Sequence, residues 1–341
     1  MGKKKQKTAL ITGSAGFIGY HTSKRLLDEG WRIVGIDCMS DYYDVSLKER
    51  RESMLLQSAS YRSVHQKVET PNVLMSLFAE ERPDIVIHLA AQAGVRYSIE
   101  NPRAYLESNL SGTFELLEAA RTYPPAHMLL ASTSSVYGAN VEMPYKETVK
   151  ADHQISFYAA TKKSTENMAH SYAHLFKLPI TMFRFFTVYG PWGRPDMALF
   201  KFTRAILDGK PIDVYNSGKM SRDFTFIDDL VTSIRALIDC TPEPYKKDIE
   251  HISESASPVA PYRIVNIGNS KPEKLEDFID AIEKSVGKKA VRNYLPMQGG
   301  DVPETWADTT LLSCLIKSIP DTKIEDGVRQ FVDWYKNYYQ R

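Results

Sequence analysis

The segment Thr8-Ala-Leu-Ile-Thr12, followed at once by Gly13-Ser-Ala-Gly16-Phe-Ile-Gly19, decides the fold of this 341-residue chain. Thr8–Thr12 is an apolar, β-rich run that predicts a buried strand, and His21 to Asp28 has the pattern of a helix. Glycines at a strand-to-helix turn let the backbone approach a pyrophosphate, which the free N–H groups of the helix N-terminus attract. The sequence therefore predicts a dinucleotide site that includes Gly13, Gly16, Phe17, Ile18 and Gly19.

An acidic residue ends the next predicted strand, Arg32-Ile-Val-Gly-Ile36. Asp37 follows Gly19 at close to the offset of about 20 residues at which an acid binds the adenosine ribose hydroxyls in such sites. A carboxylate at this place repels a 2′-phosphate. We therefore expect NAD rather than NADP as the cofactor.

Strands and helices alternate along residues 1–190, which is typical of an α/β protein with a Rossmann-type, doubly wound parallel sheet. The character of the chain changes after Gly190, where Pro191-Trp-Gly-Arg-Pro195 and further turn residues follow. We expect a Rossmann domain and a smaller C-terminal substrate-binding domain. The Rossmann domain comprises residues 1–190 with later segments near 224–240 and 262–284, and the smaller domain is mainly 191–223 and 285–341.

Tyr158-Ala-Ala-Thr-Lys162 lies in a predicted helix over residues 157–176. Residues four apart share one face of a helix, so a phenol and an ammonium group are expected side by side. A fixed cation lowers the pKa of a nearby phenol, which makes Tyr158 a candidate base. The spacing by itself is a weak signal, because Tyr215 and Lys219 repeat it in a segment that predicts a loop.

The composition excludes several classes of protein. Hydrophobic residues make up 43%, charged residues 25%, and the formal net charge is +1, so neither disorder nor general affinity for nucleic acid is indicated. The three cysteines are far apart and not in metal-ligand spacing, so we expect no disulfide framework and no metal site. No apolar run is long enough to span a membrane, and the N-terminus lacks a signal-peptide pattern. These observations favour a cytoplasmic protein.

Together these motifs resemble the extended short-chain dehydrogenase/reductase family along nearly the whole chain. The matching pieces are Gly13…Gly16…Gly19, Asp37, Asn109-Leu-Ser-Gly112, Thr133 with Val136-Tyr-Gly138, and Tyr158…Lys162. The resemblance implies that Tyr158 is the base, Lys162 its electrostatic partner and a ligand of the NAD ribose, and Thr133 a partner of the reacting sugar oxygen. The further cofactor contacts that it implies are Ala90, Ala91, Asn109 and Ser132.

Within this family, segments 90–98 and 184–197 are similar to UDP-glucuronate 4-epimerases, which interconvert UDP-glucuronate and UDP-galacturonate through a 4-keto intermediate. This similarity implies a UDP-sugar substrate whose carboxylate faces Ser134 and Thr187. Arg222 is expected at the diphosphate, and Arg194 and Arg96 are further candidates for substrate contact. The family also implies a homodimer, formed through the predicted helices over 101–121 and 157–176.

Several other functions are weighed against this one. Related dehydratases carry carboxylates directly after the catalytic threonine, where this chain has Ser134 and Ser135. UDP-glucuronate decarboxylases tend to carry a glutamate at the Ser135 position, and hexose 4-epimerases of the family commonly have an asparagine at that of Thr187. A decarboxylase, another UDP-hexose 4-epimerase and a non-catalytic NAD-binding sensor stay open as alternatives. One departure from the family is Lys67-Val-Glu69, where many relatives have an aspartate for the adenine amino group.

Overall fold

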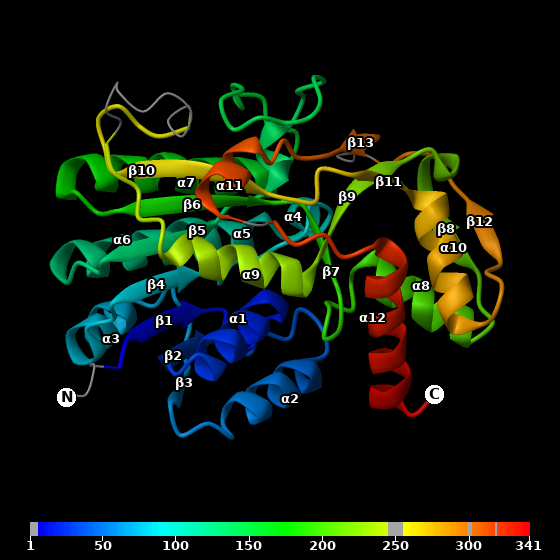
Figure 1. Ribbon diagram of the computed structural model, residues 1–341, viewed down its shortest axis with the longest axis horizontal. Coiled ribbons are helices and arrows are strands. Elements are labelled where there is room, and N and C mark those ends of the chain that lie inside the picture. The colour runs from blue at the N-terminus through cyan, green and yellow to red at the C-terminus, as the bar shows by residue number, and fades with distance from the viewer. Residues whose placement is uncertain (1–5, 245–254, 299–301, 318) are drawn as a thin grey trace.

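A seven-stranded sheet with helices on both faces forms the larger part of the computed structural model (Figure 1). The structure describes residues 6–244, 255–298, 302–317 and 319–341, so the first five residues of the N-terminal segment lie outside it. The strand order is β10-β6-β5-β4-β1-β2-β3, and each neighbouring pair is parallel. The strands are β1 Thr8–Thr12, β2 Arg32–Asp37, β3 Tyr61–His65, β4 Ile85–His88, β5 His127–Ala131, β6 Ile180–Phe185 and β10 Tyr262–Ile267. The predicted Rossmann-type fold is confirmed.

The two faces of this sheet are covered by different helices, and alternate residues of the strands pack on each. Leu10 of β1 belongs to the core beneath α3 (Val73–Glu81), α6 (Gly112–Thr122) and α7 (Phe157–Phe176). Its neighbours Ala9 and Ile11 belong to the core beneath α1 (Phe17–Asp28) and α9 (Ile227–Ile238). Strands buried on both faces explain why the sheet residues are almost uniformly apolar.

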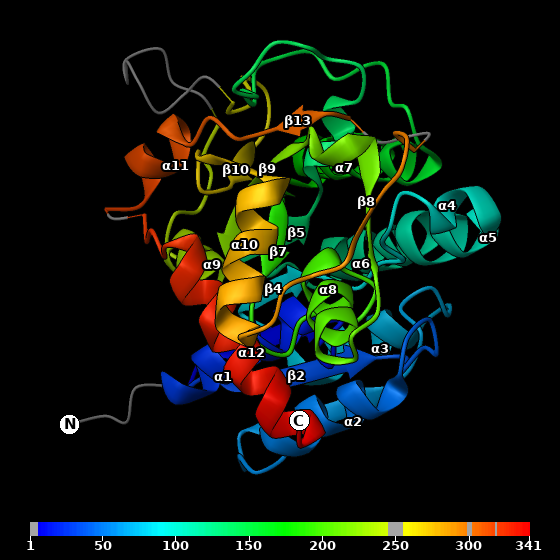
Figure 2. The same cartoon turned by 90° about the vertical axis from the view of Figure 1, so that its right-hand side faces the viewer.

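A smaller unit lies at the right of Figure 1 and faces the viewer in Figure 2, where α8, α10 and α12 are grouped together. Its helices are α8 Ala198–Leu207, α10 Leu275–Val286 and α12 Ile324–Tyr339, and α10 packs against the other two. One small sheet joins β9 (Ser221–Phe226) to β7 (Thr187–Tyr189), β11 (Pro272–Lys274) and β13 (Glu304–Thr305). Another pairs β8 (Ile212–Val214) with β12 (Arg292–Tyr294).

The later segments divide between these two units. Helix α9 packs against α1, and β10 is an edge strand of the large sheet, so both elements lie with the larger unit. Helix α10, however, comes from the segment near 262–284 and packs in the smaller unit, because its apolar face meets α8 and α12. Helix α11 (Thr310–Leu315) contacts β10 of the large sheet, although it belongs to the segment assigned to the smaller domain.

The helix expected over residues 101–121 is broken into several pieces. Helix α4 (Tyr97–Glu100) is followed by α5 (Pro102–Tyr105), a π-helix (Leu106–Ser111) and α6. The π-helix has i→i+5 hydrogen bonds and therefore shifts the helical register. Leu106 and Phe114, on the π-helix and α6, are exposed.

Candidate active site

A cleft of about 480 Å³ opens at the carboxyl ends of β1, β2, β4 and β5. The strand order reverses between β1 and β4, and open α/β sheets bind ligands at such a point. Most of the predicted site residues meet in this cleft. They are Gly13, Gly16, Phe17, Ile18, Gly19, Asp37, Ala90, Ala91, Ser132, Thr133, Tyr158, Lys162 and Arg194. Lys67 and Glu69 also line it.

The glycine turn leaves room for backbone but not for side chains. Gly13 has a φ of +70°, and a Cβ atom there would lie 2.8 Å from the amide nitrogen of Ala90. A Cβ atom on Gly19 would lie 2.0 Å from the carbonyl oxygen of Gly13. Helix α1 starts directly after Gly16, and no side chain of the described residues caps its N-terminus. The first-turn N–H groups can therefore bind an anion, which fits the pyrophosphate of a dinucleotide.

Asp37 ends β2 at the cleft, as predicted, and it has a partner that the sequence did not reveal. The Nζ atom of Lys48 lies 3.3 Å from Oδ1 of Asp37, with the two side chains 8% and 6% exposed. Asp37 also accepts hydrogen bonds from the backbone N–H groups of Ala15 and Met39. Lys48 lies on α2 (Val45–Leu55), within a polar segment that we interpret as an insertion, and its sequence pattern gave no signal of this pairing.

The three predicted catalytic residues lie together where β5 meets α7. The side chain of Thr133 lies next to Tyr158 and lowers the pKa of this phenol. Thr133 Oγ1 donates to Ser135 Oγ over 3.2 Å and accepts from the backbone N–H of Ser135. Lys162 is buried, and its Nζ atom donates to the carbonyl oxygen of Ala131 over 2.8 Å. The helix spacing thus brings the phenol and the ammonium group to the same strand end.

The effect of Lys162 on the pKa of Tyr158 stays a prediction, because other groups dominate that pKa in this structure. Burial raises the pKa of Tyr158, and the opposing effects are the side chain of Thr133 and the positive charge of Arg194. Burial also lowers the pKa of Lys162 to about 8, although the charge of Glu166 acts in the other direction. The cation that favours the phenolate is therefore Arg194, while Lys162 is directed toward Ala131.

Arg194 is held in place by groups from the smaller unit and from the large one. Its guanidinium forms two hydrogen bonds to Asp196, at 3.0 and 2.5 Å. The Tyr42 hydroxyl donates to the same carboxylate over 3.4 Å. The Tyr42 ring packs on Tyr97, which is followed by Tyr105 and Tyr158 in one row of aromatic contacts. Sequence reasoning missed these three tyrosines, because they come from segments whose proximity only the fold determines.

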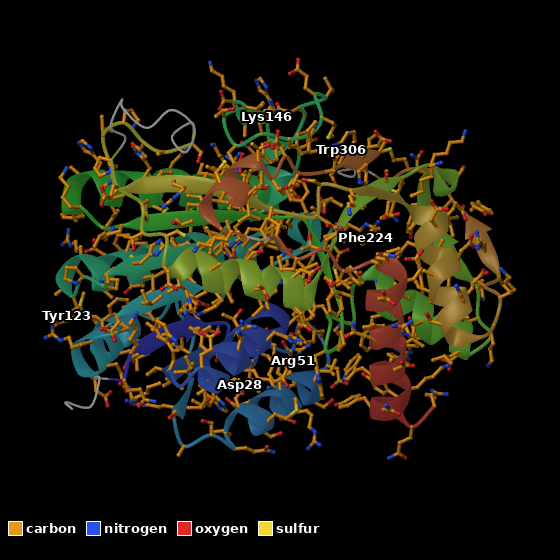
Figure 3. The ribbon with its side chains drawn as sticks, viewed as in Figure 1. Asp28, Arg51, Tyr123, Lys146, Phe224 and Trp306 are labelled. Atoms are coloured by element: carbon orange, nitrogen blue, oxygen red, sulfur yellow. The ribbon has the colours of Figure 1, made fainter. Side chains whose placement is uncertain are left out.

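Arg51, which Figure 3 labels near α2, connects the glycine turn to the segment that carries Arg194. This side chain on α2 is fully buried, and Nη1 donates to the carbonyl oxygen of Ala15 over 3.1 Å. Its Nη2 atom donates to the carbonyl oxygen of Trp192 over 2.6 Å. The guanidinium therefore links the glycine turn to the Trp192 segment, which carries Arg194 into the cleft.

Two predicted contacts lie behind the wall of the cleft. Asn109 is buried, its Oδ1 atom accepts from the backbone N–H of Gln92, and its Nδ2 atom donates to Thr161 Oγ1. It thus supports Gln92, which does line the cleft. Ser134 is the first residue of the short 3₁₀ helix that Thr133 caps.

Three further predicted substrate residues stand outside the lining of the cleft. Thr187 lies in β7 and lines a small apolar cavity of about 30 Å³. Arg222 donates to the carbonyl oxygens of Val302 and Pro303 at 2.7 and 3.0 Å. The guanidinium of Arg96 lies over the ring of Tyr215, 4.8 Å from its centroid.

His88 is a structural residue. Its Nδ1 atom lies 2.8 Å from Thr12 Oγ1, and its Nε2 atom lies 3.2 Å from Thr113 Oγ1. Burial lowers its pKa to about 3, so the ring is neutral. Within the described ranges, no three His, Cys, Asp or Glu side chains are grouped to hold a metal ion, and no helix is suited to cross a membrane.

A glycine turn for a dinucleotide, an acid at the ribose position and a Thr–Tyr–Lys group at the strand ends define an enzyme of the extended short-chain dehydrogenase/reductase class. The model of the NAD dependent epimerase/dehydratase family matches residues 9–249, and the chain belongs to this family. The family expected from the sequence motifs is thereby confirmed.

The similar proteins include several that are named for one activity. A probable UDP-glucuronate 4-epimerase of Rhizobium meliloti (strain 1021) is 53% identical over 97% of this chain and 98% of its own length. UDP-glucuronate 4-epimerase 1 of Arabidopsis thaliana is 43% identical, over 97% of this chain and 77% of its own. The crystal structure of UDP-glucuronic acid 4-epimerase from Bacillus cereus, in complex with UDP-glucuronic acid and NAD, is 32% identical with a TM-score of 0.86. That comparison covers 97% of this chain and all of the other.

Proposed function

We propose that this chain is an NAD-dependent enzyme that inverts C4 of UDP-glucuronate to give UDP-galacturonate. The observation that carries the proposal is that Thr133 and Tyr158 line the dinucleotide cleft together, and that Ser134 and Ser135, rather than acids, follow Thr133. The relatives and the structural neighbour described above support the same activity. The glycine turn and Asp37 hold the cofactor.

The chain's residues supply the proton chemistry. The chemistry that NAD⁺ supplies when bound is the uptake of a hydride from C4 and its later return to C4. Tyr158, as the phenolate, takes the proton of the O4 hydroxyl as the C4–H bond breaks, which leaves a ketone at C4. Thr133 holds O4 next to this base. After the sugar turns its other face, Tyr158 returns the proton to O4, and C4 is inverted with no net oxidation.

The hydroxyl groups near Thr133 favour epimerisation over decarboxylation. A 4-keto uronate is a β-keto acid, which loses CO₂ when the bond to the carboxylate stands perpendicular to the carbonyl plane. We infer that Ser134 and Thr187, with Thr133, hold the carboxylate near that plane. Hydrogen bonds to a charged group are worth about 1.5–3 kcal/mol each, so together they slow the loss of CO₂ by orders of magnitude. Arg222, Arg194 and Arg96 are assigned to the substrate on the strength of the family motif.

Incubation of the enzyme with UDP-glucuronate and separation of the products by anion exchange tests the proposal. We expect UDP-galacturonate at near-equal equilibrium with little pentose. Predominant UDP-xylose or a 4-keto-pentose would identify a decarboxylase instead. Comparable turnover of UDP-glucose would identify a hexose epimerase.

The variant Tyr158→Phe separates an enzyme from a non-catalytic NAD sensor. Loss of a general base costs about 10²–10⁴-fold in rate, so turnover should fall by that factor while folding and NAD content are kept. Unchanged biological function in this variant would favour the sensor. Because the reaction regenerates NAD⁺ in each cycle, the purified protein should also carry it. Assay of the supernatant after heat denaturation measures the released dinucleotide.

We also propose that the enzyme is a homodimer. Large apolar side chains are exposed near and on the π-helix, α6 and α7, among them Ile99 at 69% and Leu175 at 63%. Others on these elements are Leu106, Phe114, Phe157 and Phe176. Exposed apolar faces on the two helical elements that the family uses fit a second copy of this chain. Light scattering should give twice 38.7 kDa, and Phe114→Asp should shift the mass toward one chain.

The remaining features complete the proposal. Residues 1–190 with α9 and β10 form the cofactor-binding domain, and α8, α10 and α12 with the small sheets form the substrate-binding domain. Cys38, Cys240 and Cys314 are all free thiols, which supports a reducing cytoplasm as the location. Cell fractionation with a tagged chain checks this placement.

A further inference from the structure

One face of α7 contacts three successive residues at and just after the end of β5, which are Ala131, Ser132 and Thr133. Tyr158, Lys162 and Glu166 lie four residues apart and therefore share this face. Tyr158 lies next to the side chain of Thr133, and Lys162 donates to the Ala131 carbonyl oxygen over 2.8 Å. Between these two, the Ser132 hydroxyl donates to Glu166 Oε1 over 2.7 Å. The helix thus contacts each of Ala131, Ser132 and Thr133 through one side chain, and Glu166 makes the contact to Ser132.

Glu166 is fixed by an ion pair on its other side. Arg184 of β6 donates from Nε to Oε1 over 2.9 Å and from Nη2 to Oε2 over 2.8 Å. Both side chains are 1% exposed. The Arg184 guanidinium lies over the ring of Tyr137, 4.6 Å from its centroid, and Lys163 reaches Oε2 over 3.3 Å. With these partners both carboxylate oxygens are engaged, so Glu166 has one position.

A buried ion pair is a weak source of stability, because desolvation of both charges offsets their attraction. A placement beside the catalytic residues therefore suggests another role. We propose that Glu166, paired with Arg184, is a positioning residue: through Ser132 it fixes the segment that carries Thr133, and its charge stabilises the ammonium group of Lys162. The expected effect on catalysis rests on the proposed function. The expected effect on the charge state of Lys162 does not.

The groups that face Lys162 support the electrostatic part. Burial lowers the pKa of Lys162 to about 8, and the negative charge of Glu166 raises it against this effect. His88 on β4 faces Lys162 and is neutral, since burial lowers its own pKa to about 3. Tyr158 is the third group, and burial raises its pKa, which favours the neutral phenol. Among these neighbours in the described structure, Glu166 alone carries a negative charge at neutral pH.

The variant Glu166→Gln keeps the side-chain shape and an acceptor for Ser132 but removes the charge. Without that charge Lys162 loses its proton at lower pH, so the alkaline limb of the kcat profile should move to lower pH. A move of about one unit lowers kcat about tenfold on the alkaline side. Because this variant leaves Arg184 buried without a counterion, a second variant, Glu166→Gln/Arg184→Gln, replaces the pair with two amides. It should show a smaller shift in the same direction, because the positive charge of Arg184 is lost as well.

Two controls make the result specific. Lys163→Met removes another charge that contacts Glu166 and should leave the alkaline limb in place. Ser132→Ala removes the contact to Glu166 but keeps the charge, so it should lower kcat at every pH without moving the limb. The double variant Glu166→Gln/Arg184→Gln is called the neutral-pair variant below. If its kcat had the same pH profile as that of the wild type, the inference would be overturned.

The titration of Lys162 can also be followed without turnover, by NMR of protein labelled with ¹³C at the lysine Cε and assigned with Lys162→Met. The pKa of Lys162 should be lower in the neutral-pair variant than in the wild type. An equal pKa in both proteins contradicts the inference. Inactivity of the wild type toward UDP-glucuronate, with the expected shift in this titration, would instead count against the proposed function alone.

Discussion

Lys48 and Asp37 form an ion pair at the ribose end of the cleft, with 3.3 Å between Nζ and Oδ1. The pair places a cation beside the carboxylate that we expect to reject a 2′-phosphate. In Asp37→Asn the cation has no counterion, so it should attract that phosphate. A charge-assisted hydrogen bond is worth about 1.5–3 kcal/mol, and the preference for NAD over NADP should narrow by about tenfold or more. Binding of each dinucleotide to the stripped protein measures this ratio.

The matched control for this change is Asp37→Asn/Lys48→Met, which lacks both charges. It should lose affinity for NAD without a comparable gain for NADP. An equal gain for NADP in both variants would show that Lys48 has no part in the choice of cofactor.

Arg194 should set the acid limb of the pH–rate profile. Its positive charge lowers the pKa of Tyr158 against the effect of burial. Removing the charge in Arg194→Met therefore raises the pKa of the phenol, and a phenolate base then requires higher pH. The acid limb of kcat should move upward, with about tenfold lower activity on that side for each pH unit. Arg194→Lys keeps the charge, so its acid limb should lie close to that of the wild type. A loss of kcat in Arg194→Met that is equal at every pH would contradict the assignment.

Arg51 should stabilise both the fold and the bound cofactor. In Arg51→Met the carbonyl oxygens of Ala15 and Trp192 lose a buried donor. An unsatisfied buried group costs about 1–3 kcal/mol, so urea unfolding should show a loss of about 2–5 kcal/mol. The cofactor should also dissociate faster, because the glycine turn loses a support. The neighbouring variant Arg50→Met removes an exposed charge and should change neither quantity.

Glu147 should make stability depend on pH. It is largely buried beside β10, where its Oε1 atom accepts from the backbone N–H of Asn266 over 2.8 Å. Burial raises its pKa from 4.5 to about 7. Between these values the unfolded chain has released the proton while the folded chain keeps it, so the contribution to stability falls as the pH rises from about 4.5 to about 7.

Glu147→Gln resembles the protonated acid and cannot ionise. It should therefore match the wild type near pH 4.5 and exceed it at pH 8, by up to about 3 kcal/mol of unfolding free energy. Thermal melts at the two pH values measure the difference. Glu142→Gln, an exposed position on the same loop, is the control. The same difference at both pH values would exclude titration of Glu147 as the cause.

Local patterns predicted the parts of the molecule that local forces determine. The glycine turn, Asp37 and the helix over 157–176 were visible in the sequence, because strand and helix periods and turn chemistry act over a few residues. The Tyr158–Lys162 spacing likewise placed both side chains on one helix face.

Contacts between distant segments were beyond such patterns. Arg222 donates to Val302 and Pro303 because the pairing of Glu304 with Ser221 brings that segment alongside β9. Nothing near Arg222 in the sequence indicates this pairing. The π-helix over 106–111 changed the register of its own helix, and no local composition distinguishes it from an α-helix.

The three contacts between α7 and Ala131–Thr133 restrict how the length of this helix can change. Each residue advances an α-helix by about 100°. One residue inserted or deleted between Tyr158 and Glu166 would therefore turn one or two of the three side chains away from the strand end. Natural variants of this helix should accordingly differ by substitution within 158–166, and changes in its length should lie outside this span.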